Sequence, residues 1–184
     1  QNIKITKQDD FLFVKKILLN RRKVFFGHGY DVHKFKKGNS IVLCGIKIPF
    51  NKSLDGYSDA DVALHSLCDA LLGAAGLGDI GEHFSPSNKK YKNINSIYLL
   101  KETYSYLEET QNEINNIDIT IVAEKPKLGK YKKLMRKKIS STLNLNYKQV
   151  NIKATTTEGL GFIGEGKGIA SHAFVTLTKN YENE

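Results

Sequence analysis

SDADVALHSLCDALLGAAG, residues 58–76, decides the expected fold, because it carries the clearest helix pattern in the chain. Ser58 and Asp61 stand in the spacing of a capping box, strong helix formers follow, and glycines mark the end. We therefore predict a helix over 58–76. The segments on either side of it indicate what it packs against.

Those neighbouring segments alternate between strand and helix patterns. Residues 40–50, SIVLCGIKIPF, are rich in β-forming side chains, and residues 95–110 have the period of an amphipathic helix. One face of that second helix is expected to hold Ile97, Leu100, Tyr104 and Leu107. The remaining predicted elements are a strand over 116–124, a basic amphipathic helix over 129–144, and strands over 149–157 and 169–178. Strands interleaved with helices predict an α/β or α+β sandwich with one helical layer against a sheet.

The composition predicts a single domain without a membrane span. The chain has 184 residues, of which 40% are hydrophobic and 26% charged, enough for one sizeable core. Its net charge of +9 fits a nucleic-acid partner, a membrane surface, an anionic substrate or simply a Lys-rich surface, so charge alone does not choose. Cys44 and Cys68 form no CxxC pair and are expected to be small buried side chains. No apolar stretch is long enough to span a bilayer.

Domain boundaries are expected near residue 24. Residues 1–24 are predicted to be an N-terminal arm or the remnant of a targeting segment, and residues 25–184 the single domain. Asp9, Asp10 and the pair Lys15–Lys16 argue against a secretory signal. The basic arm and the Lys- and Asn-rich composition predict a plastid of a eukaryote, apicoplast-like, with the cytoplasm as the alternative location.

The stretch GHGYDVHKF, residues 27–35, carries a candidate metal site. In an extended strand the side chains of Asp31 and His33 leave the same face, so they would project together. A His from the helix over 58–76 would complete a set of three protein ligands with one open position, the pattern of catalytic zinc. The alternative is that Asp31 and His33 are ordinary surface residues.

The helix supplies the third ligand in this hypothesis. Asp61, His65 and Asp69 follow one another at intervals of four, which places them on one helical face. His65 is the predicted ligand, and Asp61 or Asp69 could orient a ligating histidine through a hydrogen bond. The alternative is a helix histidine with hydrogen-bonded neighbours and no metal.

GLGDIGEHF, residues 76–84, is a glycine-dense loop around Asp79. Such a loop lets the backbone approach a ligand closely, and an Asp there can accept hydrogen bonds from ribose hydroxyls. The alternative is an ordinary exit from the helix with an Asx turn, which the spacing alone favours.

KATTTEGLGFIGEGKG, residues 153–168, is the second dense stretch. Three threonines at a probable strand end precede Glu158, whose carboxylate suits Mg²⁺. GFIGEGK fits most of the phosphate-loop pattern, but residue 168 is Gly where Ser or Thr is needed, and a strand pattern follows. A P-loop NTPase is therefore rejected.

Four stretches together resemble the 2-C-methyl-D-erythritol 2,4-cyclodiphosphate synthase family of the non-mevalonate isoprenoid pathway. They are GHGYDVHKF, SDADVALHSLCDALLGAAGLGDIGEHF, DITIVAEKPKL and KATTTEGLGFIGEGKGIA, in this order and spacing. The resemblance runs from about Gly27 to Thr178. It implies a ferredoxin-like α/β fold, with a mixed sheet and helices on one face, and a homotrimer with active sites between subunits.

The resemblance also implies a set of site residues. Zinc would be bound by Asp31, His33 and His65, and Mg²⁺ or Mn²⁺ by Glu158 between the substrate phosphates. Tyr57 and Thr156 would be catalytic. The implied substrate contacts are Asp31, His33, Tyr57, Ser58, Asp79, Ile80, Gly81, Ser87, Asn88, Ala123, Pro126, Lys127, Leu128, Ala154, Thr155, Thr156, Thr157, Glu158 and Phe162.

The implied activity is that of a lyase. It closes 4-diphosphocytidyl-2-C-methyl-D-erythritol 2-phosphate into 2-C-methyl-D-erythritol 2,4-cyclodiphosphate and releases CMP. The cytidine diphosphate substrate and other copies of the chain would be its partners, with neither nucleic acid nor membrane among them. Two rival hypotheses are a zinc phosphoesterase, which would hydrolyse the substrate, and a nucleic-acid binder, which the Lys-rich segment 130–138 supports only weakly.

The chain departs from the family pattern at three places. Tyr57 stands where the family usually has His before Ser-Asp, and Tyr cannot carry imidazolium charge at neutral pH. FSPSN, residues 84–88, replaces the usual FPDTD, so Ser87 and Asn88 would act as neutral hydrogen-bonding groups. Glu165 replaces an Arg usual near the centre of the trimer, so the resemblance does not carry binding of isoprenoid diphosphates over to this chain.

Overall fold

A five-stranded mixed sheet forms the centre of the structure, which is a computed structural model describing residues 6–12, 22–85 and 87–180. The strands lie in the order β4 (Lys52–Leu54), β1 (Arg22–Lys37), β7 (Gly168–Asn180), β5 (Asn112–Val122) and β6 (Val150–Thr155). β5 and β6 pair in parallel, and the other neighbours are antiparallel. The sheet therefore begins at Arg22, close to the predicted domain start, while residues 1–5 and 13–21 of the predicted arm lie outside the described residues.

Residues 40–50 form a separate hairpin of β2 (Ser40–Leu43) and β3 (Ile46–Pro49). Its two turn residues, Cys44 and Gly45, have φ values of 53° and 72°, as a tight hairpin turn requires. The Asp61 carboxylate accepts hydrogen bonds from the backbone N–H groups of both, at 2.9 and 2.6 Å. The turn is thus tied to the start of the following helix.

Helix α2 (Val62–Ala75) is the predicted central helix, but it begins four residues later than the pattern suggested. Asp61, not Ser58, is the N-cap, and its side chain accepts from the backbone N–H of Leu64. Ala60 has a φ of 57°, which is incompatible with a right-handed helix, so 58–61 form a loop. At the other end Gly76, at a φ of 72°, is the predicted glycine C-cap.

Two glycines bring α2 close to the sheet. A Cβ on Gly27 would lie 1.9 Å from the Ala70 carbonyl oxygen, and a Cβ on Gly29 would lie 1.9 Å from that of Ser66. The backbones of β1 and α2 therefore pack directly on each other. This contact places the side chains of β1 that follow Gly29 against the first turns of α2.

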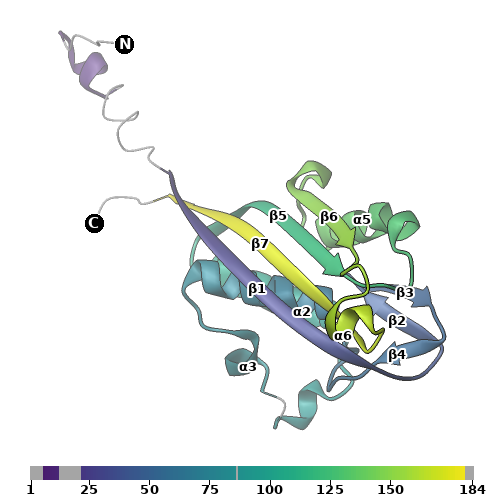
Figure 1. Cartoon of the computed structure of the whole chain (residues 1–184). Helices are drawn as coiled ribbons and strands as arrows, with labels where there is room; N and C mark the ends of the chain where they lie inside the picture. Colours follow the sequence, from purple (N-terminus) through teal and green to yellow (C-terminus); the bar gives the residue numbers. More distant parts are fainter. Residues whose placement is uncertain (1–5, 13–21, 86, 181–184) are drawn as a thin grey trace.

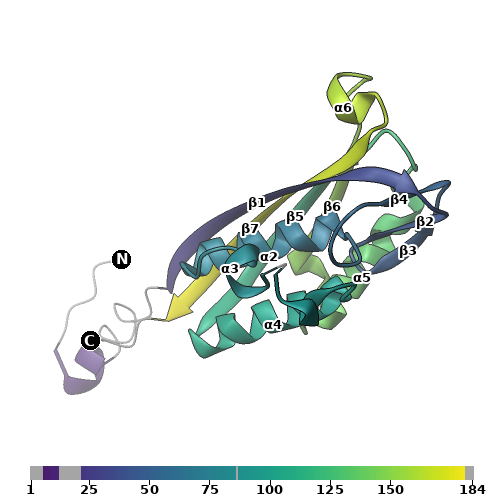
Figure 2. The ribbon, with the colours of Figure 1, turned by 90° about the horizontal axis from the view of Figure 1, so that it is seen from below.

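The helices form one layer, as predicted. Figure 2 shows α2, α3 (Ile80–His83), α4 (Ser96–Glu109) and α5 (Lys132–Thr142) on one face of the sheet, with the short α6 (Gly161–Gly164) on the other side near its end. The described residues also form three 3-10 turns: η1 (Lys89–Tyr91), η2 (Gly129–Tyr131) and η3 (Tyr147–Gln149). The predicted face of α4 is buried at Leu100 and Leu107 and only half-buried at Ile97 and Tyr104. The α/β sandwich is therefore confirmed.

The core lies between this helical layer and the sheet. Cys44 and Cys68 are both fully buried in it, as predicted. Burial raises the pKa of the Cys68 thiol to about 12, so it behaves as a small apolar side chain. In the described part of the chain, no helix has the length and apolarity needed to cross a membrane.

The opposite face of β1 and β7 is largely uncovered by helices (Figures 1 and 2). Alternate residues of the two strands point outward there, and Phe26, Phe174 and Tyr30 are 77%, 53% and 46% exposed. We call this surface the open face. Its members are Val24, Phe26, His28, Tyr30, Val32, His172 and Phe174.

Candidate active site

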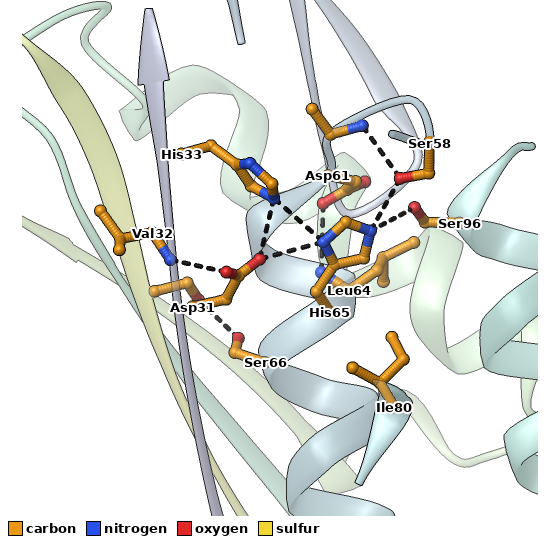
Figure 3. Close-up of polar contacts among 12 residues, drawn as sticks. Asp31, Val32, His33, Ser58, Asp61, Leu64, His65, Ser66, Ile80 and Ser96 are labelled. Carbon is orange, nitrogen blue, oxygen red and sulfur yellow. Dashed lines mark hydrogen bonds and ion pairs between the residues drawn. The ribbon is translucent and has the colours of Figure 1, made fainter. Parts of the chain in front are cut away.

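Three predicted metal ligands converge between β1 and α2 (Figure 3). Asp31 Oδ2 lies 3.0 Å from His33 Nε2 and 3.0 Å from His65 Nδ1, and the two nitrogens are 3.1 Å apart. Asp31 and His33 leave the same face of the strand, as the period of two predicts, and the helix brings His65 to them. Among the described residues, this is the one cluster of three or more His, Cys, Asp or Glu side chains able to hold a metal ion.

The donor set of this triad fits a metal ion. One carboxylate oxygen and two imidazole nitrogens are three protein ligands, and they leave a coordination position for water or substrate. All three residues are half-buried, so a ligand can reach them from one side. The arrangement therefore suits a metal that takes part in chemistry better than one that only supports the fold.

Electrostatic interactions between Asp31 and His33 favour opposite charges on these two side chains when no metal is bound. Burial acts to raise the pKa of Asp31, but hydrogen bonds from His33 and His65 outweigh it and hold that pKa well below its usual range. Burial likewise acts to lower the pKa of His33, yet the Asp31 hydrogen bond and charge raise it overall. A bound cation would take the place of the proton on His33 Nε2.

Both histidines are fixed by contacts on their second nitrogen. His33 Nδ1 lies 2.7 Å from the Asp55 carbonyl oxygen. His65 Nε2 lies 2.9 Å from the Ser58 hydroxyl and 3.0 Å from the Ser96 hydroxyl (Figure 3). Each ring is therefore held with one nitrogen toward the metal position and the other toward the protein.

The prediction that Asp61 or Asp69 orients His65 is wrong. Asp61 is directed into the β2–β3 turn and its own helix start, and burial raises the pKa of its carboxyl to about 6. Asp69 Oδ1 accepts from the backbone N–H of Ile80 at 2.8 Å and so fixes the start of α3. Residues four apart on a helix share a face, but each of these carboxylates found backbone donors in another segment.

A cavity of about 220 Å³ opens beside the triad. Its walls include four of the predicted substrate contacts besides the triad, namely Tyr57, Ser58, Ile80 and Gly81. The rest is contributed by Asp69 and by the apolar side chains of Phe84, Tyr91, Ile94 and Leu99. The site therefore combines a charged metal position with an apolar wall, as a ligand pocket does.

The loop replacing the family's usual FPDTD lies at the rim of this cavity. The Tyr57 hydroxyl donates to the Asn88 carbonyl oxygen at 3.3 Å, and Asn88 is the N-cap of η1. Ser87 contacts Ser85 through their hydroxyls at 2.8 Å. Asp79 is the N-cap of α3 and accepts from the backbone N–H of Glu82 at 3.0 Å, which is the Asx arrangement considered as the alternative.

A second cavity, of about 430 Å³, gathers most of the remaining predicted contacts. It lies at the ends of β5 and β6 and is lined by Ala123, Pro126, Lys127, Leu128, Gly129, Lys132, Ala154, Thr155 and Thr156. No residue lines both this cavity and the one beside the triad. Within one chain the two groups of predicted residues are therefore in different places.

Glu124, which was not predicted, joins the two loops of the second cavity. Its carboxylate accepts from the backbone N–H of Thr157 at 2.8 Å and from that residue's hydroxyl at 3.2 Å. The backbone hydrogen bond from Thr157 lowers the pKa of Glu124. The motif VAEKPKL contains Glu124, but its role depends on a partner 33 positions away, and nothing in the local pattern indicates that pairing.

Glu158 and Phe162 lie outside both groups. The Glu158 carboxylate accepts from the Thr156 hydroxyl at 2.9 Å, and the triad cluster does not include it. Phe162 lines another hollow together with Val32 and Lys167. The structure thus brings the three zinc candidates together but does not add the predicted Mg²⁺ ligand to them.

Comparison with known proteins identifies the family. Residues 24–178 match the model of the YgbB family. The chain is 52% identical over 151 residues to the 2-C-methyl-D-erythritol 2,4-cyclodiphosphate synthase of Alkaliphilus metalliredigens, a match covering 82% of this chain and 95% of that protein. It is 49% identical over 174 residues to the bifunctional enzyme IspD/IspF of Campylobacter concisus, covering 95% of this chain and 47% of that enzyme. The chain therefore spans about half the length of such bifunctional relatives.

Solved structures agree with this assignment. The bifunctional IspDF of Campylobacter jejuni superposes with a TM-score of 0.83 at 46% identity, covering 86% of this chain and 43% of that one. The CDP complex of Plasmodium falciparum IspF superposes with a TM-score of 0.76 at 35% identity, covering 86% and 97%. These matches confirm the resemblance seen in the sequence motifs, and the chain belongs to the YgbB family, whose members include the 2-C-methyl-D-erythritol 2,4-cyclodiphosphate synthases.

Proposed function

We propose that this chain converts 4-diphosphocytidyl-2-C-methyl-D-erythritol 2-phosphate to 2-C-methyl-D-erythritol 2,4-cyclodiphosphate and CMP, as a lyase of isoprenoid precursor synthesis. The observation that carries the proposal is the convergence of Asp31, His33 and His65 beside a cavity lined by the chain's own family motifs. The names of the relatives support it, since close ones are synthases of this product over nearly their full length.

The proposed metals are zinc at the triad and Mg²⁺ or Mn²⁺ at Glu158. Two imidazoles and one carboxylate are a common donor set for catalytic zinc, and a single hard carboxylate beside substrate phosphates suits Mg²⁺. Bound there, the ions would polarise phosphate oxygens and neutralise charge that accumulates as the ring closes.

The reaction needs positioning more than proton transfer. An oxygen of the substrate's 2-phosphate forms a bond to the β-phosphorus, and the bond from that phosphorus to the oxygen bridging it to the α-phosphate breaks, so that CMP leaves with the electron pair. The attacking oxygen is already ionised at neutral pH, and the protein must fold the substrate so that attack is in line.

The second cavity suits the cytidine diphosphate part of the substrate. Ala123, Pro126 and Leu128 give it a small apolar wall, while Lys127 brings positive charge and Thr156 a hydroxyl. Thr156 is the proposed catalytic residue on this side, stabilising charge on the transferring phosphoryl group. Tyr57 and Ser58 are the proposed contacts on the triad side, with Asp79, Ile80 and Gly81 toward the ribose and with Ser87 and Asn88 at the rim.

We further propose a homotrimer in which each active site combines the triad of one copy with the second cavity of its neighbour. The two cavities share no lining residue within a chain, although the proposed contacts of one substrate are divided between them. The open face offers an apolar surface for the contact between copies, since the side chains of Phe26, Tyr30 and Phe174 are exposed there in a single chain. A closed ring of copies would bury it.

The test is ³¹P NMR of the purified protein with the diphosphocytidyl substrate, zinc and Mg²⁺, comparing wild type with His65→Ala. The proposal predicts CMP and a cyclic diphosphate, both lost in the variant. Ring-opened phosphate products would instead identify a phosphoesterase on the same scaffold. Unchanged substrate with a folded, metal-loaded wild-type protein would refute the proposed reaction.

The plastid location and the domain boundary at residues 24 and 25 stay predictions. The relatives named above from Alkaliphilus and Campylobacter are bacterial, and the match to the family begins at residue 24. Expression of the full native precursor with a fluorescent tag would test the location directly.

A further inference from the structure

We propose that Asp59 and Ser96 form a hydrogen-bond chain that holds His65 in the tautomer presenting Nδ1 to the metal. Both are positioning residues, because they act through His65 and lie behind it. The proposal deepens the proposed function, since it rests on the triad being a metal site.

The starting observation is the orientation of the His65 ring. Its Nδ1 faces Asp31 and His33, so a metal bound by the three would coordinate that nitrogen. Its Nε2 points the opposite way, toward the hydroxyls of Ser58 and Ser96 (Figure 3). A neutral imidazole carries one proton, and metal binding at Nδ1 requires that this proton sit on Nε2.

The direction of the hydrogen bonds at Ser96 places the proton there. Ser96 Oγ lies 2.5 Å from Asp59 Oδ1, and the Ser96 backbone N–H donates to Asp59 Oδ2 at 3.1 Å. A carboxylate only accepts, so the Ser96 hydroxyl gives its single proton to Asp59. That leaves the lone pairs of the hydroxyl to accept from His65 Nε2–H.

Ser58 touches the same nitrogen but does not decide its protonation. Its hydroxyl accepts weakly from the Ala60 backbone N–H at 3.2 Å, and among the described residues no carboxylate accepts its proton. It can therefore turn to donate or to accept. Ser96, by contrast, is fully buried, so water does not substitute for its hydroxyl.

The surrounding backbone keeps Asp59 in place. Its N–H donates to the Ile94 carbonyl at 3.0 Å, and the Asn93 N–H donates to the Tyr57 carbonyl at 2.8 Å. Ser96 is the first residue of α4, so the carboxylate of Asp59 also faces a helix N-terminus, where negative charge is favourable. The chain Asp59, Ser96, His65 thus links α4, the loop before α2 and the metal position.

The test measures zinc affinity of the metal-free protein by competition with a chromogenic chelator, for wild type, Ser96→Ala, Asp59→Asn and Ser58→Ala. Partners of this kind change metal affinity by about 10- to 100-fold. We expect losses in that range for Ser96→Ala and Asp59→Asn, and little loss for the matched control Ser58→Ala. The double variant Ser96→Ala/Asp59→Asn should lose no more than the worse single variant, because the two act in series.

A second measurement separates positioning from simple support of the fold. NMR of the zinc-loaded protein reports the proton on His65 Nε2, and we expect that proton to be hydrogen-bonded and slow to exchange with water in wild type. Asp59→Asn keeps the size of the side chain but can present an amide donor, which would reverse the Ser96 hydroxyl. The hydroxyl would then no longer accept the Nε2 proton, and that proton should exchange faster with water. Should Ser96→Ala fail to fold, Asp59→Asn alone carries the test.

The outcomes distinguish this proposal from the proposed function. Variants that melt at lower temperature yet keep wild-type zinc affinity and wild-type exchange of the Nε2 proton would overturn the positioning role and leave the synthase activity untouched. If zinc affinity falls as expected in the variants while the wild-type protein makes no cyclic diphosphate, the positioning role is supported and the proposed function is refuted. A wild-type protein that does not bind zinc at the triad would overturn both.

Discussion

At the scale of single residues, the proposed function depends on individual hydroxyl groups, and Thr156 is the main example. Thr156 lines the second cavity, and its hydroxyl donates to the Glu158 carboxylate at 2.9 Å. A hydroxyl carries one proton, so Thr156 can donate to a phosphoryl oxygen only after this contact is released, as it would be if Glu158 bound Mg²⁺. The role proposed for Thr156 can therefore be tested by removing the oxygen alone.

Thr156→Val should lower kcat by about 10² to 10³ with little change in KM, because the valine keeps the shape but loses the donor. CMP release measured at saturating substrate checks this. Thr156→Ser keeps the hydroxyl and should retain most of the activity. A Val variant as fast as wild type would leave only the backbone N–H of Thr156 for the proposed role.

The sequence could predict the three candidate metal ligands but not the residues that contact them from behind. Asp31 and His33 follow from the period of a strand, and His65 follows from a helix packed on it. Ser96 lies 31 positions from His65, and Asp59 lies 37 positions from Ser96. Serine and aspartate hydrogen bonds across such separations leave no local spacing, so only the folded structure reveals them.

At the scale of elements, the start of α2 shows how tertiary contacts override a local pattern. Ser58 and Asp61 have the spacing of a capping box, but the Ser58 hydroxyl contacts His65 and Ala60 has a left-handed backbone. Asp61 instead caps the helix and holds the β2–β3 turn through its second oxygen. The existence of the helix was predictable. Its first residue was not, because the Ser58 side chain contacts His65 and does not cap the helix.

Asp61→Asn should destabilise the fold by about 1 to 3 kcal/mol, because the amide nitrogen would face a backbone N–H of the turn and leave a buried donor unpaired. Urea denaturation at pH 5 checks the loss. The far-UV spectrum of the variant at low denaturant should remain that of the wild type.

The same variant tests how the contribution of Asp61 to folding stability depends on pH. Burial raises the pKa of this carboxyl in the folded state to about 6 from 3.8, so its favourable contribution to folding is fully present below pH 3.8 and is lost as the pH rises through about 6. The difference in stability between wild type and Asp61→Asn should thus narrow from pH 5 to pH 8. A difference that widens would show that the three backbone donors keep the carboxylate ionised.

The contact of α2 with β1 offers a test with an internal control. Gly29→Ala would place a Cβ 1.9 Å from the Ser66 carbonyl oxygen, so helix and strand must separate, and we expect a loss of several kcal/mol or no folded protein. Gly73→Ala lies within α2 with nothing within 4 Å of the added Cβ, and it should stabilise by about 0.5 to 1 kcal/mol. Thermal melting of the two variants side by side checks both signs.

For the whole molecule, the open face stands out because a single copy of the chain leaves its apolar side chains exposed. A sheet covered by helices on one side only follows from the order of strand and helix patterns, and the sequence predicted it. The strand order β4-β1-β7-β5-β6 could not be predicted from the sequence, because it depends on pairing of β1 with β7, which come from opposite ends of the domain. That pairing leaves apolar side chains such as Phe26 exposed on the open face.

Phe26→Lys should prevent assembly of the proposed trimer without unfolding the chain, since this side chain is already 77% exposed in one copy. Light scattering coupled to size exclusion should show monomers and a loss of activity. Leu134→Lys, at a 53% exposed apolar residue on α5, is the matched control and should remain trimeric and active. Trimers of Phe26→Lys would place the interface elsewhere.

The separation of the two cavities gives the molecule a property familiar from genetics, complementation between defective subunits. In a trimer built as proposed, His65→Ala damages one side of each interface and Thr156→Val the other, so a mixed trimer contains interfaces at which both sides are intact. Random mixing of equal amounts of the two inactive variants, by refolding together, should therefore restore about a quarter of wild-type activity. If both cavities of one chain served the same substrate, every mixture would stay as inactive as its parts.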